Sequence, residues 1–195
     1  MTIWQAATQM VEHAEVKRLD GSDREQFHSL LLSLDDASRA ARFNGWTSDA
    51  QLRSHTEHAL SSADWIAGAF VQTRLRGVVE IYGYDHLGFA EASFIVVPEW
   101  RRQGFATLLL HAAMDWCRQS GQPLLRMVFS RTNLPMRRLV AKTPARLDLA
   151  FDEMSAEIAL RSQLDRQAIA GRSTHSCKQK SNPEGDGHAT FSAPR

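Results

Sequence analysis

The sequence predicts an α+β domain built on a mixed sheet, and two patterns carry this prediction. Residues 64–72 and 75–84 are rich in β-branched and aromatic residues and are separated by a short polar turn, which is typical of an antiparallel hairpin. Residues 89–97 form a further strand pattern, followed by a helical pattern and by the apolar run 124–130. A strand, a helix and a strand in this order form a right-handed crossover, which predicts a parallel pair within the sheet.

Length and composition are those of one globular domain. The chain has 195 residues, of which 43% are hydrophobic, and a net charge of +1, which does not favour nucleic acid or an anionic membrane as a partner. No apolar run approaches the roughly 20 residues of a membrane-spanning helix, and the first residues do not resemble a secretory signal, so we expect a cytoplasmic protein. Cys117 and Cys177 are expected to be unpaired thiols, and they give no metal spacing.

We expect three regions along the chain. Residues 1–14 read as an N-terminal extension without a clear helix cap, and residues 15–160 as the folded domain. Residues 161–195 are rich in Ser, Gln, Lys, Gly and Pro and contain almost no apolar side chains. Because such a segment buries too little surface to offset its ordering entropy, a disordered tail is expected there.

The first third of the domain predicts a strand and two helices. A short strand is expected at 15–19, and Ser22-x-x-Glu25 has the capping-box pattern of a helix that continues to about Leu34. Residues 35–46 are expected to end this helix and to turn at Asn44-Gly45. Ser48-x-x-Gln51 then predicts the start of a second helix, which runs to about residue 60.

The remaining elements follow from turn and helix signals. The hairpin turn is expected at Thr73-Arg74, and the helix after the third strand is expected to end near Gln119, before Gly121 and Pro123. A short helix is predicted at 133–142. Pro135 is compatible with it, because the N–H that proline lacks has no partner in the first turn of a helix. Two last strands, 147–151 and 155–160, are expected around a turn near residues 152–153.

The strand at 89–97 has two faces, and the helix after it has one buried stripe. Alternation places Ala90, Ala92, Phe94 and Val96 on one face and Glu91, Ser93, Ile95 and Val97 on the other. Apolar residues then recur at helical spacing at Phe105, Leu108, Leu109, Ala112, Ala113, Trp116 and Cys117. Between strand and helix lies the basic turn Arg101-Arg102-Gln103-Gly104-Phe105-Ala106.

A turn of this kind at a helix N-terminus is suited to an anion. The first N–H groups of a helix lack partners within the helix, and the helix dipole adds positive potential there. Gly104 and Ala106 leave room for the backbone to approach a phosphate, and Arg101 and Arg102 can add charge-assisted contacts.

Arg101-x-x-Gly104-x-Ala106, after a strand that ends in Val96-Val97-Pro98, resembles the acyl-CoA signature of the GCN5-related N-acetyltransferase (GNAT) superfamily. Asn133-x-x-Met136-x-x-Leu139-x-x-Lys142 is similar to a second motif of that superfamily. The resemblance covers about residues 15–160. It implies a mostly antiparallel central sheet in three layers with helices on both faces, acetyl-CoA as co-substrate, and no metal.

The resemblance also implies the residues that contact acetyl-CoA. The backbone of the strand would follow the pantetheine arm, and the N–H of Val96 would donate to the thioester oxygen. The implied contacts are Ile95, Val96, Val97, Arg101, Arg102, Gln103, Gly104, Phe105, Ala106, Thr107 and Asn133. Asn133 is equally expected as a plain helix cap.

A general base is expected because an amine must lose a proton to attack a thioester. Glu91, on the strand that leads into the cofactor site, is the first candidate; its alternative role is a salt bridge. Glu80, on the neighbouring strand, is the second. Many relatives carry a tyrosine as general acid at the position of Val140, so the acid is open between Tyr82, Tyr84 and none.

The expected function is transfer of an acetyl group from acetyl-CoA to a primary amine by direct attack. The amine belongs to a small molecule or to a protein lysine or N-terminus, and the sequence does not distinguish them. The alternative is a non-catalytic acyl-CoA-binding sensor, which the valine at position 140 also fits. Partners are acetyl-CoA and the amine, without nucleic acid or membrane, and a homodimer is left open because dimers are common in the superfamily.

Overall fold

The computed structural model describes residues 13–43, 45–84 and 88–160. The predictions for residues 1–14 and 161–195 therefore fall, apart from residues 13 and 14, outside the described residues, as does Cys177. The first strand begins at Ala14, one residue before the expected domain boundary.

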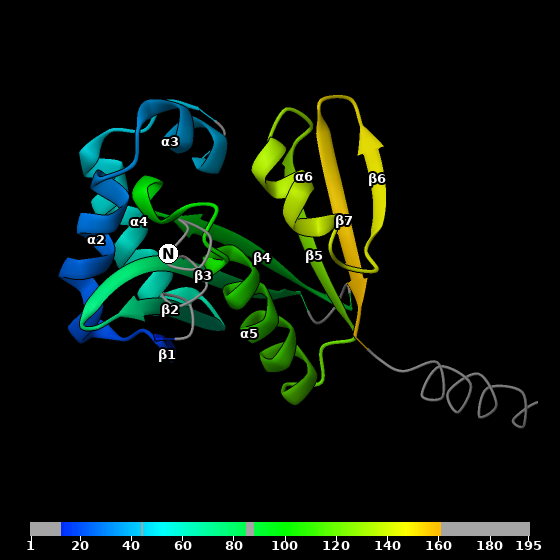
Figure 1. Ribbon diagram of the computed structural model, residues 1–195, viewed down its shortest axis with the longest axis horizontal. Coiled ribbons are helices and arrows are strands. Elements are labelled where there is room, and N and C mark those ends of the chain that lie inside the picture. Colours follow the sequence, from blue (N-terminus) through cyan, green and yellow to red (C-terminus); the bar gives the residue numbers. More distant parts are fainter. Residues whose placement is uncertain (1–12, 44, 85–87, 161–195) are drawn as a thin grey trace, which may run out of the picture. The chain divides into compact units, whose positions relative to one another are not determined.

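Seven strands form one mixed sheet in the order β1-β2-β3-β4-β5-β7-β6 (Figure 1). All neighbouring strands are antiparallel except β4 and β5, which are parallel as the crossover predicted. The α+β class with a mostly antiparallel sheet is confirmed. The strands are β1 (Ala14–Arg18), β2 (Trp65–Val71), β3 (Arg74–Tyr84), β4 (Phe89–Val96), β5 (Leu124–Ser130), β6 (Arg146–Ala150) and β7 (Glu153–Ala159).

The α-helices of the described residues lie between these strands in the sequence, and two short 3-10 helices precede α2 and α5. They are η1 (Gly21–Asp23), α2 (Arg24–Leu32), α3 (Asp36–Phe43), α4 (Asp49–Ser62), η3 (Pro98–Trp100), α5 (Phe105–Gln119) and α6 (Leu134–Val140). The predicted end of α5 at Gln119 and the predicted bounds of β5 are confirmed.

Helices cover both faces of the sheet, as expected (Figure 1). Leu109 of α5 packs in one core cluster with Ala92 and Met127 of the sheet. Phe27 of α2 and Leu52 of α4 pack in the other cluster. The predicted faces of β4 are confirmed, because its even-numbered residues contact the α5 cluster, whereas Ile95 and Val97 belong to the α2 and α4 cluster.

The two predicted capping boxes have different outcomes. Ser48 and Gln51 form one at the start of α4, where the Ser48 side chain accepts from Gln51 N and the Gln51 side chain from Ser48 N. The box predicted at Ser22 and Glu25 is wrong. The η1 turn precedes α2, and Asp20 and Asp23 form the box around that turn instead.

Helix α3 lies in a region where the sequence predicted only a helix end and a turn. It has no buried residues, so its sequence lacks the apolar stripe by which a helix is recognised. Side chains attach it to the rest of the domain instead: Arg39 Nε donates to the carbonyl of Leu34, and Arg39 Nη1 forms an ion pair with Asp49.

Both hairpin turns lie one residue earlier than predicted. Val71 ends β2 and Arg74 begins β3, so the turn consists of Gln72 and Thr73. Gln72 has a φ of 57° and Phe151, in the β6–β7 turn, a φ of 55°. These left-handed conformations are uncommon for such residue types, which is why the sequence did not point to them.

Candidate active site

The turn between β4 and α5 has the backbone geometry that the phosphate argument requires. Gly104 is the N-cap of α5 and has a φ of 96°, in the left-handed region that favours glycine. Arg102, two residues earlier, has a φ of 64°. Two positive φ values so close together reverse the chain sharply, and the turn leads directly into a 15-residue helix.

Side chains of this turn form hydrogen bonds with the backbone before it and with helix α3. Arg101 Nε donates to the carbonyl of Val96 at 3.0 Å, and Arg101 Nη2 donates to Ser38 Oγ of α3 at 2.8 Å. Gln103 Nε2 donates to the carbonyl of Glu99 at 2.9 Å. Arg101 thus links the end of β4 to α3, and a contact between its guanidinium and a phosphate stays a prediction.

The other residues expected at the cofactor have mixed surroundings. Phe105 is 1% exposed and packs its ring edge-on against Trp100, so its side chain belongs to the core. Ala106 and Thr107 are partly exposed in the first turn of α5. Asn133 caps α6 by accepting from Met136 N at 3.2 Å, which is the capping role that was also expected.

β4 and β5 part soon after they meet. Their parallel pairing is restricted to Ala90 with Leu125 and Glu91 with Arg126, whereas β5 pairs with β7 along its whole length. From Ala92 onward, β4 therefore has a partner strand on the β3 side and not on the β5 side.

The pairing of β4 with β3 sets the direction of the β4 backbone beyond this point. Val97 N donates to the carbonyl of Arg76, and the register is regular from there to Phe89. Because hydrogen-bonded and non-hydrogen-bonded pairs alternate in an antiparallel ladder, Ile95 bonds to β3. The N–H groups of Phe94 and Val96 point away from β3, towards the side on which β5 departs.

Glu80 is buried in a network of side chains from α3, α4 and its own strand, β3. Its carboxylate is 1% exposed, and Oε2 accepts from Arg42 Nη2 of α3 at 2.8 Å. His55 Nε2 of α4 lies 3.1 Å from Oε1, and Tyr82 Oη donates to Oε2 at 3.4 Å. Burial opposes the charged form, but Arg42 and His55 outweigh it and hold the pKa of Glu80 below its usual range.

Glu91 has different surroundings on the same face of the sheet. It is partly exposed and lies opposite Tyr82 in the ladder, and its side chain has no hydrogen bond or ion pair with any residue that the structure describes. Ser93, two residues further on, has a buried Oγ for which the described residues provide no partner. The carboxylate of Glu91 is therefore not held by other described side chains, whereas both oxygens of the Glu80 carboxylate are occupied.

Arg42 and His55 were not singled out by the sequence as partners of Glu80. They come from α3 and α4, 38 and 25 residues before Glu80, and no local pattern indicates such contacts. Val140 is 1% exposed and packs in the α5 core cluster, so this position provides no acid. Tyr82, besides donating to Glu80, stacks on His58 with ring centroids 6.5 Å apart. The side chain of Tyr84 lies outside the described residues.

Two kinds of functional feature are absent from residues 13–43, 45–84 and 88–160. No group of three or more His, Cys, Asp or Glu side chains within them is arranged to hold a metal ion. None of their helices has the length and apolar composition needed to cross a bilayer.

Comparison with protein-family models matches residues 31–143 to the acetyltransferase (GNAT) family. The chain belongs to the GNAT family. This match spans α3, β4 and β5, the turn at Gly104 and α6. Comparison with curated protein sequences finds no match.

Solved structures of GNAT proteins share the fold. The GNAT domain of S. lividans PAT is 18% identical, with a TM-score of 0.65 over 75% of this chain and 90% of that domain. An acetyltransferase from Salmonella typhimurium that modifies the N-terminal serine of a 50S ribosomal subunit protein is 16% identical, with a TM-score of 0.64 over 76% and 96%. Spermidine N-acetyltransferase from Vibrio cholerae, in complex with CoA and spermine, is 17% identical, with a TM-score of 0.63 over 76% and 96%.

Proposed function

We propose that this GNAT protein transfers an acetyl group from acetyl-CoA to a primary amine by direct attack. The observation that carries the proposal is the parting of β4 and β5 beyond Glu91, just before a glycine turn at the start of α5. It supplies an extended backbone with inward N–H groups next to an anion-binding helix terminus. The V. cholerae relative, which shares this fold, is a complex with CoA.

In this proposal the chain binds acetyl-CoA mainly through its backbone. The N–H groups of residues 103–107 hold the pyrophosphate, and β4 from Ile95 to Val97 follows the pantetheine arm. The direction of the β4 backbone supports Val96 as the donor to the thioester oxygen, because its N–H points away from β3. Such a donor stabilises the negative charge that develops on that oxygen during attack.

Glu91 is the general base of the proposed mechanism. The amine nitrogen attacks the thioester carbon, and Glu91 takes the proton from the nitrogen, directly or through one water. The carbon–sulfur bond then breaks with its electron pair on sulfur, and the thiolate takes a proton from solvent. Glu80 is the weaker candidate, because Arg42 and His55 occupy its carboxylate and favour its charged form.

The acceptor amine belongs to a small molecule or to a protein, and the relatives named above include both kinds. The proposal includes a cytoplasmic location and leaves open whether the chain acts as a monomer or as a homodimer. A panel of polyamines, amino acids and peptides, with released CoA thiol as the readout, tests the reaction and narrows the acceptor.

The decisive variant is Glu91→Gln, measured with the best acceptor of that panel. We expect kcat to fall by about 100-fold or more, with little change in CoA affinity, because a positioned base contributes roughly 100- to 10,000-fold. Glu57→Gln is the matched control; Glu57 is half-exposed on α4 and pairs with Arg24. An unchanged kcat in Glu91→Gln would remove Glu91 from the mechanism.

The alternative, a non-catalytic acyl-CoA sensor, is favoured by one observation, the buried valine at position 140. It predicts CoA binding without transfer to any amine in the panel. Absence of CoA binding would refute both functions.

A further inference from the structure

The pairing of β2 with β3 is interrupted next to Arg76. Ala69 pairs with Gly77 and Phe70 with Leu75, so Arg76 is an extra residue without a partner in β2. A bulge of this kind redirects the side chain of the extra residue. Gln26 of α2 contacts the same segment, because its side-chain oxygen accepts from Leu75 N at 3.1 Å.

Arg76 is fixed at this position from two sides. Its carbonyl accepts from Val97 N at 3.0 Å, and its guanidinium lies over the ring of Trp100, 4.5 Å from the centroid. Its Nε is buried and has no hydrogen-bond partner among the described residues. The guanidinium is therefore held in one orientation while part of its bonding capacity is unused.

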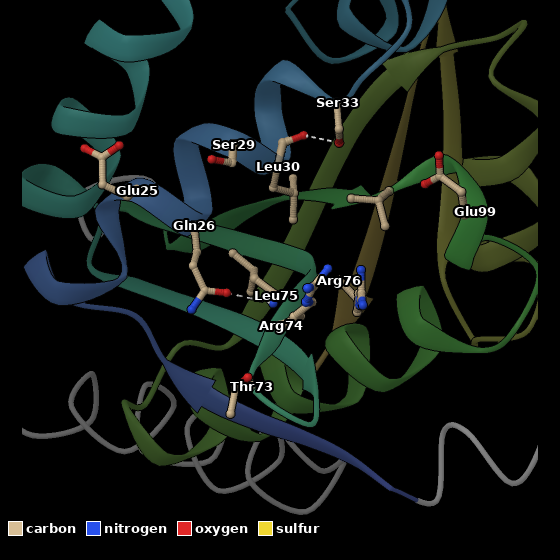
Figure 2. Close-up of a pocket in the computed structure, with 11 residues that line it drawn as sticks. Glu25, Gln26, Ser29, Leu30, Ser33, Thr73, Arg74, Leu75, Arg76 and Glu99 are labelled. Carbon is tan, nitrogen blue, oxygen red and sulfur yellow. Dashed lines mark hydrogen bonds between the residues drawn. The ribbon is translucent and has the colours of Figure 1, made fainter.

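A pocket of about 540 Å³ lies beside this arginine, between α2, the β2–β3 turn and the segment that follows β4. In Figure 2, the guanidinium groups of Arg74 and Arg76 lie in the middle of the pocket, with the carboxylates of Glu25 and Glu99 towards opposite ends. Ser29 and Thr73 add hydroxyl groups to its lining.

The charges around the pocket are not balanced at its centre. Neither Arg74 nor Arg76 forms an ion pair with the residues that the structure describes. Glu25 has a partner outside the pocket, since its Oε1 lies 4.0 Å from Arg53 Nη1 of α4. Burial and the nearby charge of Arg74 lower the pKa of Arg76, and Glu99 opposes this with a smaller effect. Two cationic side chains thus line the pocket, and neither has an ion-pair partner among the described residues.

We propose that this pocket binds a compact anionic group of a small molecule, a phosphate or a carboxylate, between Arg74 and Arg76. Guanidinium groups present planar sets of donors that match both oxyanions, and an anion between them would relieve their mutual repulsion. The pocket lies on the β3 side of β4, whereas the proposed acetyl-CoA site lies on the side from which β5 departs. Val97 lines the pocket and is also a proposed contact of the pantetheine arm, so the two sites are adjacent. Binding of the anion does not depend on the acetyltransferase reaction.

Binding is tested by NMR titration with inorganic phosphate and, separately, with succinate, at constant ionic strength and in the presence of excess CoA. The indole N–H signal of Trp100, assigned with Trp100→Phe, reports on the pocket because Arg76 lies over this ring. The stronger of the two titrants identifies the anion. Saturable shifts that persist in excess CoA are expected, since CoA would fill only the turn at α5.

Two variants should change the affinity for the anion in opposite directions. Arg76→Gln should weaken binding about tenfold or more, since loss of a charge-assisted contact costs at least about 1.4 kcal/mol. Glu99→Gln should strengthen it about threefold by removing the opposing charge. Arg118→Gln, a half-exposed arginine paired with Asp115 on α5, is the charge-matched control and should change nothing.

The proposal is overturned if CoA abolishes the shifts, if neither anion saturates, or if Arg76→Gln binds as the unchanged protein does. Arg76→Lys is the control for misfolding, because lysine keeps the positive charge but lacks the planar guanidinium. Its affinity for the anion is expected to lie between those of the unchanged protein and Arg76→Gln. Arg74→Gln, at an exposed position, provides an independent test with a smaller loss.

Discussion

Arg42 and Glu80 join α3 to the centre of the sheet through an ion pair of 2.8 Å between Nη2 and Oε2. Glu80 is 1% exposed, so removal of Arg42 leaves a buried carboxylate with less compensation. We expect Arg42→Ala to lower the free energy of unfolding by about 3 kcal/mol, measured by urea denaturation. Arg118→Ala, which breaks the exposed pair with Asp115, should cost less than about 1 kcal/mol.

The double variant Arg42→Ala/Glu80→Gln separates this explanation from a general packing loss. Since a neutral amide needs no counter-charge, the double variant should be more stable than Arg42→Ala alone. An additive result, with the two losses summed, would contradict the ion-pair account.

The pH dependence of stability follows from the lowered pKa of Glu80. The carboxyl titrates near pH 4.3 in the unfolded chain and below that in the folded chain, so its contribution is complete above about pH 4.3. The contribution is lost as the pH falls through the folded pKa. The stability difference between the unchanged protein and Glu80→Gln should therefore shrink as the pH falls below about 4. A constant difference down to pH 3 would refute the assignment.

Gly104 and Gly121 provide a matched pair of glycines with positive φ, 96° and 79°. Alanine at either position is strained by roughly 1–2 kcal/mol, because a Cβ disfavours the left-handed region. Only Gly104 lies in the proposed pyrophosphate turn. Gly104→Ala should weaken CoA binding about tenfold or more by calorimetry, whereas Gly121→Ala should lose similar stability and bind CoA normally. Equal CoA affinities would exclude the turn as the cofactor anchor.

Cys117 should be a slow-reacting thiol. It is fully buried on α5, and burial raises its pKa to about 12, so the reactive thiolate is scarce at neutral pH. In a Cys177→Ser background, iodoacetamide should modify Cys117 at least about 100-fold more slowly in the native protein than in urea, measured by mass spectrometry. Rapid native labelling would show that α5 opens locally.

Much of the fold could be predicted because its signals are local. The alternation in β4 and the apolar stripe of α5 follow from periodicity, and the cap at Ser48 from adjacent residues. Helix α3 was not predicted, because it has no buried apolar stripe and is attached to the domain by polar contacts such as the one between Arg42 and Glu80. The turn at Gly104 was recognisable because glycine there is required by the backbone.

The surroundings of the candidate bases could not be predicted in the same way. The sequence ranked Glu91 before Glu80 because Glu91 lies on the strand that leads into the cofactor site, and it did not indicate that the Glu80 carboxylate has partners. Their difference depends on Arg42 and His55, which reach Glu80 across the fold and not Glu91. The same holds for Arg76, whose orientation results from a one-residue slip between β2 and β3.

The parting of β4 and β5 also has a consequence for handling the protein. It leaves two unpaired strand edges within one sheet, and such edges are templates for pairing with other chains. A bound pantetheine arm would cover the edge of β4 in the way that a missing strand would. Preparations without CoA should therefore aggregate more readily than those supplied with it, and CoA added at lysis should raise the yield of monodisperse protein.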